Sequence, residues 1–222
     1  CDASNNLFPP LYTLAITAGN IASTLVLIQR ISATLENPNF LPEAEDAKPF
    51  PEKINSGIFV NNLSFSYDAN SKQVLSNINL SIPIGEWVCI IGPSGSGKST
   101  LINLLARLYD PTSGTITIDS TPLTEFAQKD LHKHISLVPQ EAQIISGTVR
   151  SNIIYGTQNS QPSQIMEAAK AADCHDFIMN LPVKYETIIG EKGQTLSGGQ
   201  RQRISIARAI ITNPDVLLLD DC

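Results

Sequence analysis

One run of nine residues has the types and the spacing needed to hold a phosphate chain. Glycines lack the β-carbon that would obstruct backbone N–H groups turned inward around an anion. A lysine at this spacing can reach the β- and γ-phosphates, and the hydroxyl after it can ligate Mg²⁺. The run therefore predicts a nucleoside triphosphate site, with Lys98 taking part in turnover and Ser99 ligating the metal. Its residues are Gly92, Pro93, Ser94, Gly95, Ser96, Gly97, Lys98, Ser99 and Thr100.

The flanking residues predict the elements that would position this loop. An apolar run, Trp87–Ile91, precedes it and is typical of a strand, and an apolar face at helical spacing follows it. A strand–loop–helix order distinguishes a phosphate-binding loop from a chance match. The helix N-terminus would add its partial positive charge beside the phosphates. The helical face consists of Leu101, Leu104, Leu105 and Leu108.

A second glycine-containing motif begins at Leu196. Ser197 is a favourable N-cap, and Ile204, Ala207 and Ile211 follow at helical spacing. A capped helix start beside two glycines predicts a second anion site. The motif resembles the signature of the ATP-binding cassette (ABC) family. The resemblance implies that it contacts ATP held by the phosphate loop of a partner cassette, through Leu196, Ser197, Gly198, Gly199 and Gln200.

The run Val216–Asp220 resembles the Walker B strand of that family. Four consecutive apolar residues favour a parallel strand buried on both faces. An acid at the carboxyl end of such a strand lies where open α/β sheets place their ligands. Asp220 is therefore a predicted Mg²⁺ ligand, acting through water. The resemblance makes Asp221 the general base for the attacking water, although active cassettes usually have glutamate there.

Three further positions match the family pattern. Gln140 resembles the Q-loop glutamine, which implies contact with Mg²⁺ and the attacking water, although a solvated loop glutamine is the alternative. Tyr67 stands where an aromatic ring stacks on adenine, although the alternation of Leu63, Phe65 and Tyr67 also fits core packing. Glu191 resembles the X-loop acid that couples the cassette to the membrane domain.

The N-terminal part of the chain is apolar. Residues 3–29 carry no charged side chain, and Leu7–Ile28 is long enough to cross a bilayer of about 30 Å. Arg30 follows at the end leading to the ATPase, as the positive-inside rule expects of a cytoplasmic end. A buried helix of a soluble protein is the alternative. Residues 29–36 resemble the cytosolic end of the last membrane helix of ABC exporters, which implies a plasma or inner membrane location with a cytosolic ATP-binding domain.

These features predict an α/β P-loop cassette with a parallel-sheet core, an antiparallel β-subdomain and a helical subdomain. Residues 1–36 would end the transmembrane domain, 37–57 would be a linker, and 58–222 would form the ATP-binding domain. Strand patterns over 58–67, 74–82 and 115–119 and a helical pattern over 163–180 support this division. The chain starts without methionine and stops soon after Walker B, so we expect a fragment of an exporter subunit.

Composition limits the partners. A net charge of −6 argues against a nucleic-acid binder, which needs a basic surface. The four cysteines show neither zinc spacing nor a disulfide framework, and Cys89 is expected in the core.

We therefore expect an ATP- and Mg²⁺-dependent exporter subunit that pairs with a second ABC subunit as a homodimer or heterodimer. A soluble ABC ATPase is one alternative. A regulatory subunit with a degenerate hydrolysis site is another, and it rests on Asp221.

Overall fold

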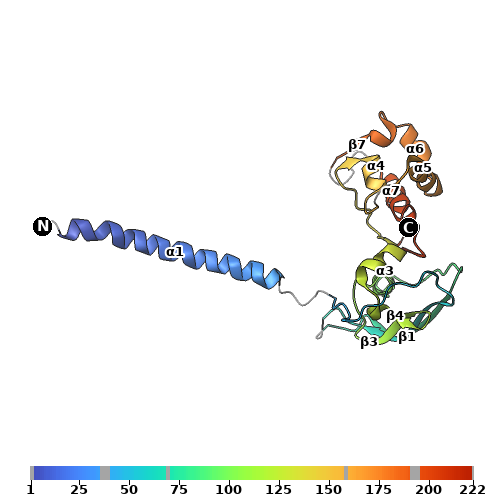
Figure 1. Ribbon diagram of the computed structural model, residues 1–222, viewed down its shortest axis with the longest axis horizontal. Helices are drawn as coiled ribbons and strands as arrows, with labels where there is room; N and C mark the ends of the chain where they lie inside the picture. Colours follow the sequence, from blue (N-terminus) through green and yellow to red (C-terminus); the bar gives the residue numbers. More distant parts are fainter. Residues whose placement is uncertain (1–2, 36–40, 69–70, 158–159, 191–195, 222) are drawn as a thin grey trace. The chain divides into compact units, whose positions relative to one another are not determined.

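The computed structural model describes residues 3–35, 41–68, 71–157, 160–190 and 196–221, in two compact units, Cys1–Pro42 and Glu43–Cys222. The first unit contains one helix, α1 (Ala3–Leu35), drawn in blue in Figure 1. Its stretch Tyr12–Ser32 is 21 residues long and apolar enough to cross a membrane. At 1.5 Å per residue it measures about 31 Å, close to the thickness of a bilayer core.

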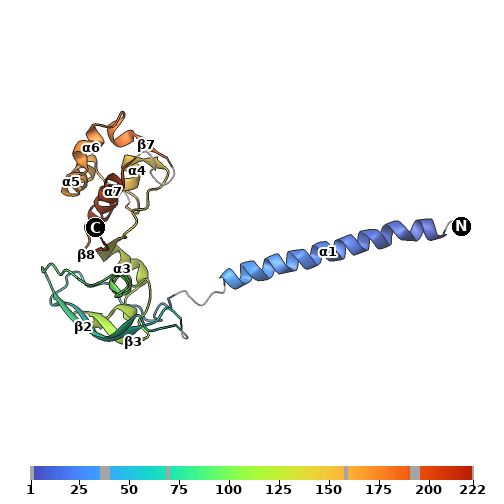
Figure 2. The same cartoon turned by 180° about the vertical axis from the view of Figure 1, so that it is seen from behind.

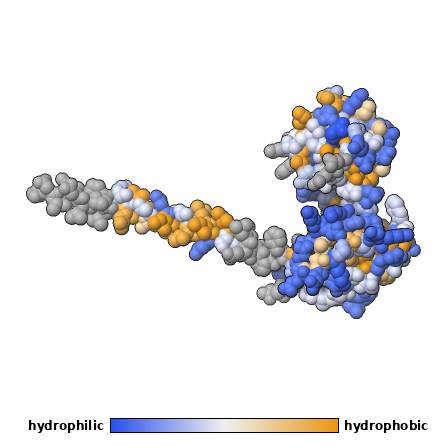
Figure 3. All heavy atoms as spheres, in the orientation of Figure 1, coloured by the Kyte–Doolittle hydropathy of each residue, from blue (hydrophilic) through white to orange (hydrophobic). Residues whose placement is uncertain are grey.

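The side chains of α1 fit a lipid surround. Apolar side chains from Tyr12 to Ile31 are exposed, as the orange surface in Figure 3 shows. The hydroxyl groups of Thr17 and Thr24 donate to the carbonyls of Thr13 and Asn20 at 2.7 and 2.8 Å. These polar groups are thus satisfied within the helix, as a segment without water contact requires.

The second unit contains an antiparallel sheet with the strand order β2-β1-β3-β4. Figure 2 labels two of its strands, β2 and β3. The predicted strands at 58–67, 74–82 and 115–119 are confirmed, with ends shifted by one to two residues. Ile58 is paired with both Ile82 and Ile118. The strands are β1 (Gly57–Phe65), β2 (Leu75–Pro83), β3 (Ser113–Ile118) and β4 (Thr121–Pro122).

The first hydrophobic core lies between this sheet and two helices, α2 (Lys98–Leu105) and α3 (Gln128–His134). The apolar face predicted for the helix after the phosphate loop is confirmed for Leu101, Leu104 and Leu105, which are buried. Leu108 lies beyond the end of α2 and is half exposed, so its predicted place on that face was wrong. The short 3-10 helix η1 (Leu123–Glu125) connects β4 to α3.

Residues 87–91 are not a strand, contrary to the sequence prediction. Trp87 is 98% exposed, Ile91 is 89% exposed and Cys89 is also exposed rather than in the core. A parallel strand takes its hydrogen bonds from segments distant in sequence, whereas an apolar run reveals only a preference for burial. Among the described strands, none pairs with residues 87–91.

The predicted Walker B strand forms as β8 (Val216–Leu219), which pairs in parallel with β5 (Ile135–Val138). Burial on both faces, however, was predicted wrongly. Leu218 is buried, but Leu217 and Leu219 are about 40% exposed. Successive side chains of a strand point to opposite faces, so Leu217 and Leu219 share the face opposite Leu218, and that face is only partly covered.

A second hydrophobic core surrounds α7 (Gly198–Ile210), where Ile204 and Ala207 are fully buried. The helical pattern predicted over 163–180 forms two helices, α5 and α6, because the chain turns at Asp173, which has φ of 51°. Cys174 lies in this core, where burial raises the pKa of its thiol to about 12. The elements are α4 (Val149–Ile153), α5 (Pro162–Ala171), α6 (His175–Met179), η2 (Lys184–Glu186), β6 (Gly147–Thr148) and β7 (Ile188–Ile189).

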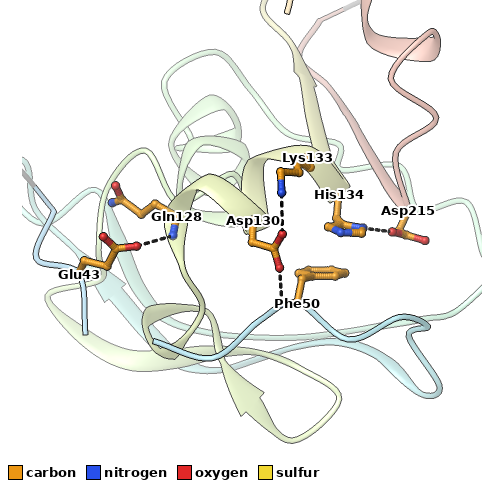
Figure 4. A network of polar contacts seen from close by, with 7 residues as sticks. All are labelled: Glu43, Phe50, Gln128, Asp130, Lys133, His134 and Asp215. Carbon is orange, nitrogen blue, oxygen red and sulfur yellow. Dashed lines mark hydrogen bonds and ion pairs between the residues drawn. The ribbon is translucent and has the colours of Figure 1, made fainter. Parts of the chain in front are cut away.

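Much of the predicted linker packs on the second unit, as Figure 4 shows. The Phe50 ring is buried and stacks on His134 with ring centroids 4.3 Å apart. The backbone N–H of Phe50 donates to Asp130 at 2.7 Å, and His134 contacts Asp215 at 2.6 Å. Residues 43–57 therefore belong to the fold of this unit, and Ile54 lies in its core.

Candidate functional site

The phosphate loop adopts a conformation that depends on its glycines. Gly95 and Gly97 have φ of 78° and 91°, in the left-handed region where residues with a side chain are strained. A β-carbon on Gly97 would also lie 2.6 Å from the Leu75 side chain. The Lys98 ammonium donates to the carbonyls of Gly92 and Pro93, at 3.0 Å each. The lysine thus lies across the mouth of the loop, with the charge needed to meet a phosphate.

Ser99 and Asp220 meet although 121 residues separate them. The Ser99 hydroxyl, on the first turn of α2, donates to a carboxylate oxygen of Asp220 at 2.9 Å. The backbone N–H of Asp220 is held by the Val138 carbonyl at 3.0 Å. The predicted metal ligands from the phosphate loop and from the end of β8 therefore share one place.

The register of the parallel pair explains how Gln140 reaches the same edge. Val138 lies opposite Leu219, so the second residue after each strand end is Gln140 on one chain segment and Asp221 on the other. The Gln140 amide donates to the Asp221 carboxylate at 2.8 Å. Asp221 itself has φ of 53°, a left-handed conformation that aspartate tolerates better than most residues. Two predicted catalytic side chains are thus in direct contact.

The side chains that meet at the ends of β5 and β8 offer the ligand atoms that Mg²⁺ prefers. They are a hydroxyl, carboxylates and an amide, and each can bind the ion through oxygen. Nowhere in the described ranges do three His, Cys, Asp or Glu side chains gather as an all-protein metal cage. A site with few protein oxygens suits an ion that keeps several waters and binds substrate phosphates.

Tyr67 lies just beyond the end of β1 and outside the buried run of residues 63–65. Leu63 and Phe65 are buried, but Tyr67 is 48% exposed. Its hydroxyl shares a hydrogen bond of 3.0 Å with the hydroxyl of Thr100, a phosphate-loop residue. The exposed ring and this link to the loop agree better with adenine stacking than with core packing.

The signature residues start α7 as predicted. The Ser197 hydroxyl accepts from the backbone N–H of Gln200 at 3.2 Å, and the Gln200 side chain accepts from the Ser197 N–H at 2.9 Å. This reciprocal capping box stabilises the helix start. Among the described residues, no hydrogen bond or ion pair joins residues 196–200 to the phosphate loop of the same chain. Glu191, the predicted coupling residue, lies outside the described residues.

Two glutamines hold Asp221 from different elements, and sequence reasoning missed one of them. The Gln202 amide, on α7, donates to the Asp221 carbonyl at 3.3 Å. Its position directly after the signature was the available signal. Arg208, also on α7, donates to the carbonyls of Asn152 and Gln143 at 2.8 Å each. Burial lowers the pKa of Arg208, and its contacts join α7 to the segment after Gln140.

Comparison with known proteins agrees with this geometry. The family model described as "ABC transporter" matches residues 75–222. An ATP-dependent lipid A-core flippase of Syntrophus aciditrophicus is 42% identical over 97% of this chain and 35% of its own length. A putative multidrug export ATP-binding/permease protein of Staphylococcus aureus is 48% identical over 77% of this chain and 30% of its own length. The chain thus spans about a third of the length of these relatives.

One solved structure covers nearly the whole chain. It is described as a bacterial Atm1-family ABC exporter with ATP bound, and it matches with a TM-score of 0.85 and 34% identity. The match covers 97% of this chain and 37% of the other. The fold is therefore that of an ABC cassette with an apolar helix before it.

Proposed function

The chain belongs to the ABC transporter family, and on that premise we propose that it is the ATP-binding and ATP-hydrolysing part of an exporter subunit. ATP binding would close two cassettes on each other, and hydrolysis would reopen them while the membrane helices alternate access. The fused apolar helix and the exporter and flippase names of the relatives support export.

The observation that carries the proposal is the meeting of Ser99 with Asp220. A phosphate loop alone would fit a kinase, a GTPase or an ATPase. Here its hydroxyl lies 2.9 Å from the acid that ends β8, while Gln140 and Asp221 lie in contact at the same edge. A phosphate cradle, a hydroxyl–carboxylate pair and a second carboxylate are the groups needed for attack of water on a terminal phosphate.

Each group then has a role in the proposed reaction. Lys98 would exchange its carbonyl partners for the β- and γ-phosphates. Ser99 and Asp220 would hold Mg²⁺, which neutralises charge on the phosphates when bound, and Gln140 would contact that ion and the attacking water. Asp221 would accept a proton from the water, while Gln140 keeps the carboxylate in place. The chemistry and the contacts of the side chains support these roles, and the family resemblance implies those of Gln140 and Asp221.

The signature would act on a second cassette. Ser197 starts a capped helix whose N-terminal N–H groups favour an anion, yet residues 196–200 make no polar contact with the phosphate loop of their own chain. Both observations are explained if the signature contacts an anion that is bound to another copy or another subunit. We therefore propose that the cassette pairs with a partner cassette, with ATP bound between the phosphate loop of one and the signature of the other.

One residue favours an unequal partner. Aspartate at position 221 is one methylene shorter than the glutamate usual there, which withdraws the carboxylate by about 1.5 Å. A general base must lie within about 2.6–3.2 Å of the proton that it accepts, so this displacement weakens catalysis. We propose that this subunit carries the weaker ATP site of a heterodimer, and that its intact signature completes the competent site of the partner.

Membrane association separates the exporter from a soluble ABC ATPase. When the protein is expressed in cells and the lysate is washed with high salt, we expect it to stay with the membranes and to be released only by detergent. The apolar face of α1 requires this, because salt removes proteins held by charge but not those held by apolar burial. Recovery in the soluble fraction after the salt wash would reject the exporter proposal.

A further inference from the structure

Three aromatic rings gather where β1 ends, beside the phosphate loop. Phe65, Tyr67 and Tyr109 contact one another pairwise, with ring centroids between 4.9 and 5.6 Å apart. Phe65 is buried in the core, whereas Tyr67 and Tyr109 are 48% and 42% exposed. Of these three rings, only Tyr67 has been assigned a contact with the nucleotide above, so Tyr109 has no role in the site so far.

Two contacts fix different motions of the Tyr67 ring. The tyrosine hydroxyl lies on the axis about which the ring turns, so its 3.0 Å hydrogen bond to Thr100 fixes the tip of the ring but not the direction of its faces. The faces are oriented by neighbours that stand perpendicular to the ring. Tyr109 does so at an interplanar angle of 89°, and Phe65 at 82°.

The backbone keeps Tyr109 close to Tyr67. The N–H of Ser66 donates to the hydroxyl of Thr112 at 3.1 Å, and the N–H of Thr112 donates to the carbonyl of Ser64 at 3.0 Å. The segment that carries Tyr109 is thereby joined to the end of β1. Both bonds are made by Thr112, three residues after Tyr109, so the backbone that follows Tyr109 is held beside the end of β1.

From these contacts we propose that Tyr109 is a positioning residue for the nucleotide base. It holds the Tyr67 ring with a face free to stack on adenine, while Thr100 sets the distance between that ring and the phosphate loop. This inference rests on the proposed ATP site. A Tyr67 ring that is free to turn would lose rotational entropy when adenine stacks on it, and this loss would offset part of the stacking free energy. The proposal therefore predicts that adenine adds most to the affinity for ATP when Tyr109 already orients the Tyr67 ring.

Affinities for two probes test the proposal: Mg-ATP and inorganic tripolyphosphate, which has the phosphate chain but no base. With the intact protein in detergent, Tyr109→Ala should weaken Mg-ATP binding by about 2- to 12-fold, the value of one perpendicular aromatic pair. Its affinity for tripolyphosphate should stay within about twofold of the wild type. Tyr109→Phe, which keeps the ring, should bind both probes like the wild type.

The controls separate this proposal from the ATP site itself. Tyr109→Leu keeps apolar bulk but removes the ring. If Tyr109→Ala is too unstable to measure, Tyr109→Leu replaces it, and the same selective loss of Mg-ATP affinity is expected. Tyr155→Ala removes an exposed tyrosine elsewhere, and both affinities should remain unchanged. Equal losses for both probes in Tyr109→Ala would show a purely structural role and overturn the proposal, and so would no loss for either. A wild-type protein that binds neither probe would instead refute the ATP site.

Discussion

At the scale of single residues, the proposed function makes Asp221 the residue that would limit turnover. Its carboxylate is held by Gln140 at 2.8 Å and its carbonyl by Gln202 at 3.3 Å, so it is ordered by two elements at once. If Asp221 is the general base, as we propose, these contacts would keep its short side chain from moving toward the attacking water. The proposed weakness would then come from the length of one side chain.

We therefore expect Asp221→Glu to raise the ATPase rate of the purified subunit at least tenfold, because general-base catalysis contributes about 10²- to 10⁴-fold. Steady-state phosphate release at saturating Mg-ATP measures it. Asp176→Glu, the same change at an exposed position on α6, is the matched control and should have no effect. Rapid turnover by the wild type alone, with no gain in Asp221→Glu, would show that aspartate suffices and that no unequal partner is needed.

At the scale of elements, local patterns were predicted well and distant pairings poorly. The Ser197 cap and the β1, β2 and β3 strands follow from residue types and alternation, and they form as expected. The run 87–91 has the same kind of local pattern, but a strand also needs a partner, and its sequence does not encode one. For Ser99, Asp220, Gln140 and Asp221 the sequence predicted roles at one site but no contacts. The Ser99–Asp220 and Gln140–Asp221 contacts depend on the register of the parallel strands, which only the fold determines.

The packing of residues 43–57 on the second unit was not predicted either. Their composition, rich in proline and charge, resembles a linker, yet Phe50 and Ile54 are buried at its few apolar positions. Asp130 accepts the backbone N–H of Phe50, a partner 80 residues away that composition cannot reveal. Main-chain bonds attach the segment as well, since the N–H of Lys48 donates to the carbonyl of Glu125 and the carbonyl of Lys48 accepts from Ala127.

The hydrogen bond of Asp130 predicts a pH-dependent contribution to stability. The Phe50 N–H and then Lys133 hold the pKa of Asp130 below its ordinary value, so its contribution is full above about pH 4 and is lost as pH falls through the lowered pKa. Asp130→Asn should therefore lower the free energy of unfolding by about 1 kcal/mol at pH 7, as measured by urea titration.

The cost of Asp130→Asn should shrink as the pH falls from about 4 through the lowered pKa of Asp130, because the wild-type carboxyl then becomes protonated as well. Asp46→Asn, at an exposed position in the same segment, is the control and should cost little at any of these pH values. A cost of Asp130→Asn that does not change with pH would assign the effect to packing rather than to the charge.

At the scale of the whole molecule, the chain joins an apolar helix to a nucleotide-binding fold. The stretch Tyr12–Ser32 exposes apolar side chains, and the hydroxyl groups of Thr17 and Thr24 donate to carbonyls within the helix. The second unit brings four predicted catalytic and metal residues to one edge of a parallel strand pair. The proposed export would need both parts, since energy released at the cassette would have to move the membrane segments. ATP binding at the phosphate loop is the step on which the proposed function depends.

Equilibrium binding of Mg-ATP to the intact protein in detergent, compared with its Lys98→Ala variant, tests that claim most directly. We predict saturable binding of one ATP per chain in the wild type and a loss of at least about tenfold in Lys98→Ala, since the lysine supplies the charge that meets the phosphates. Lys170→Ala, at an exposed position on α5, should bind like the wild type. Equal ATP affinity in Lys98→Ala and the wild type would contradict the account.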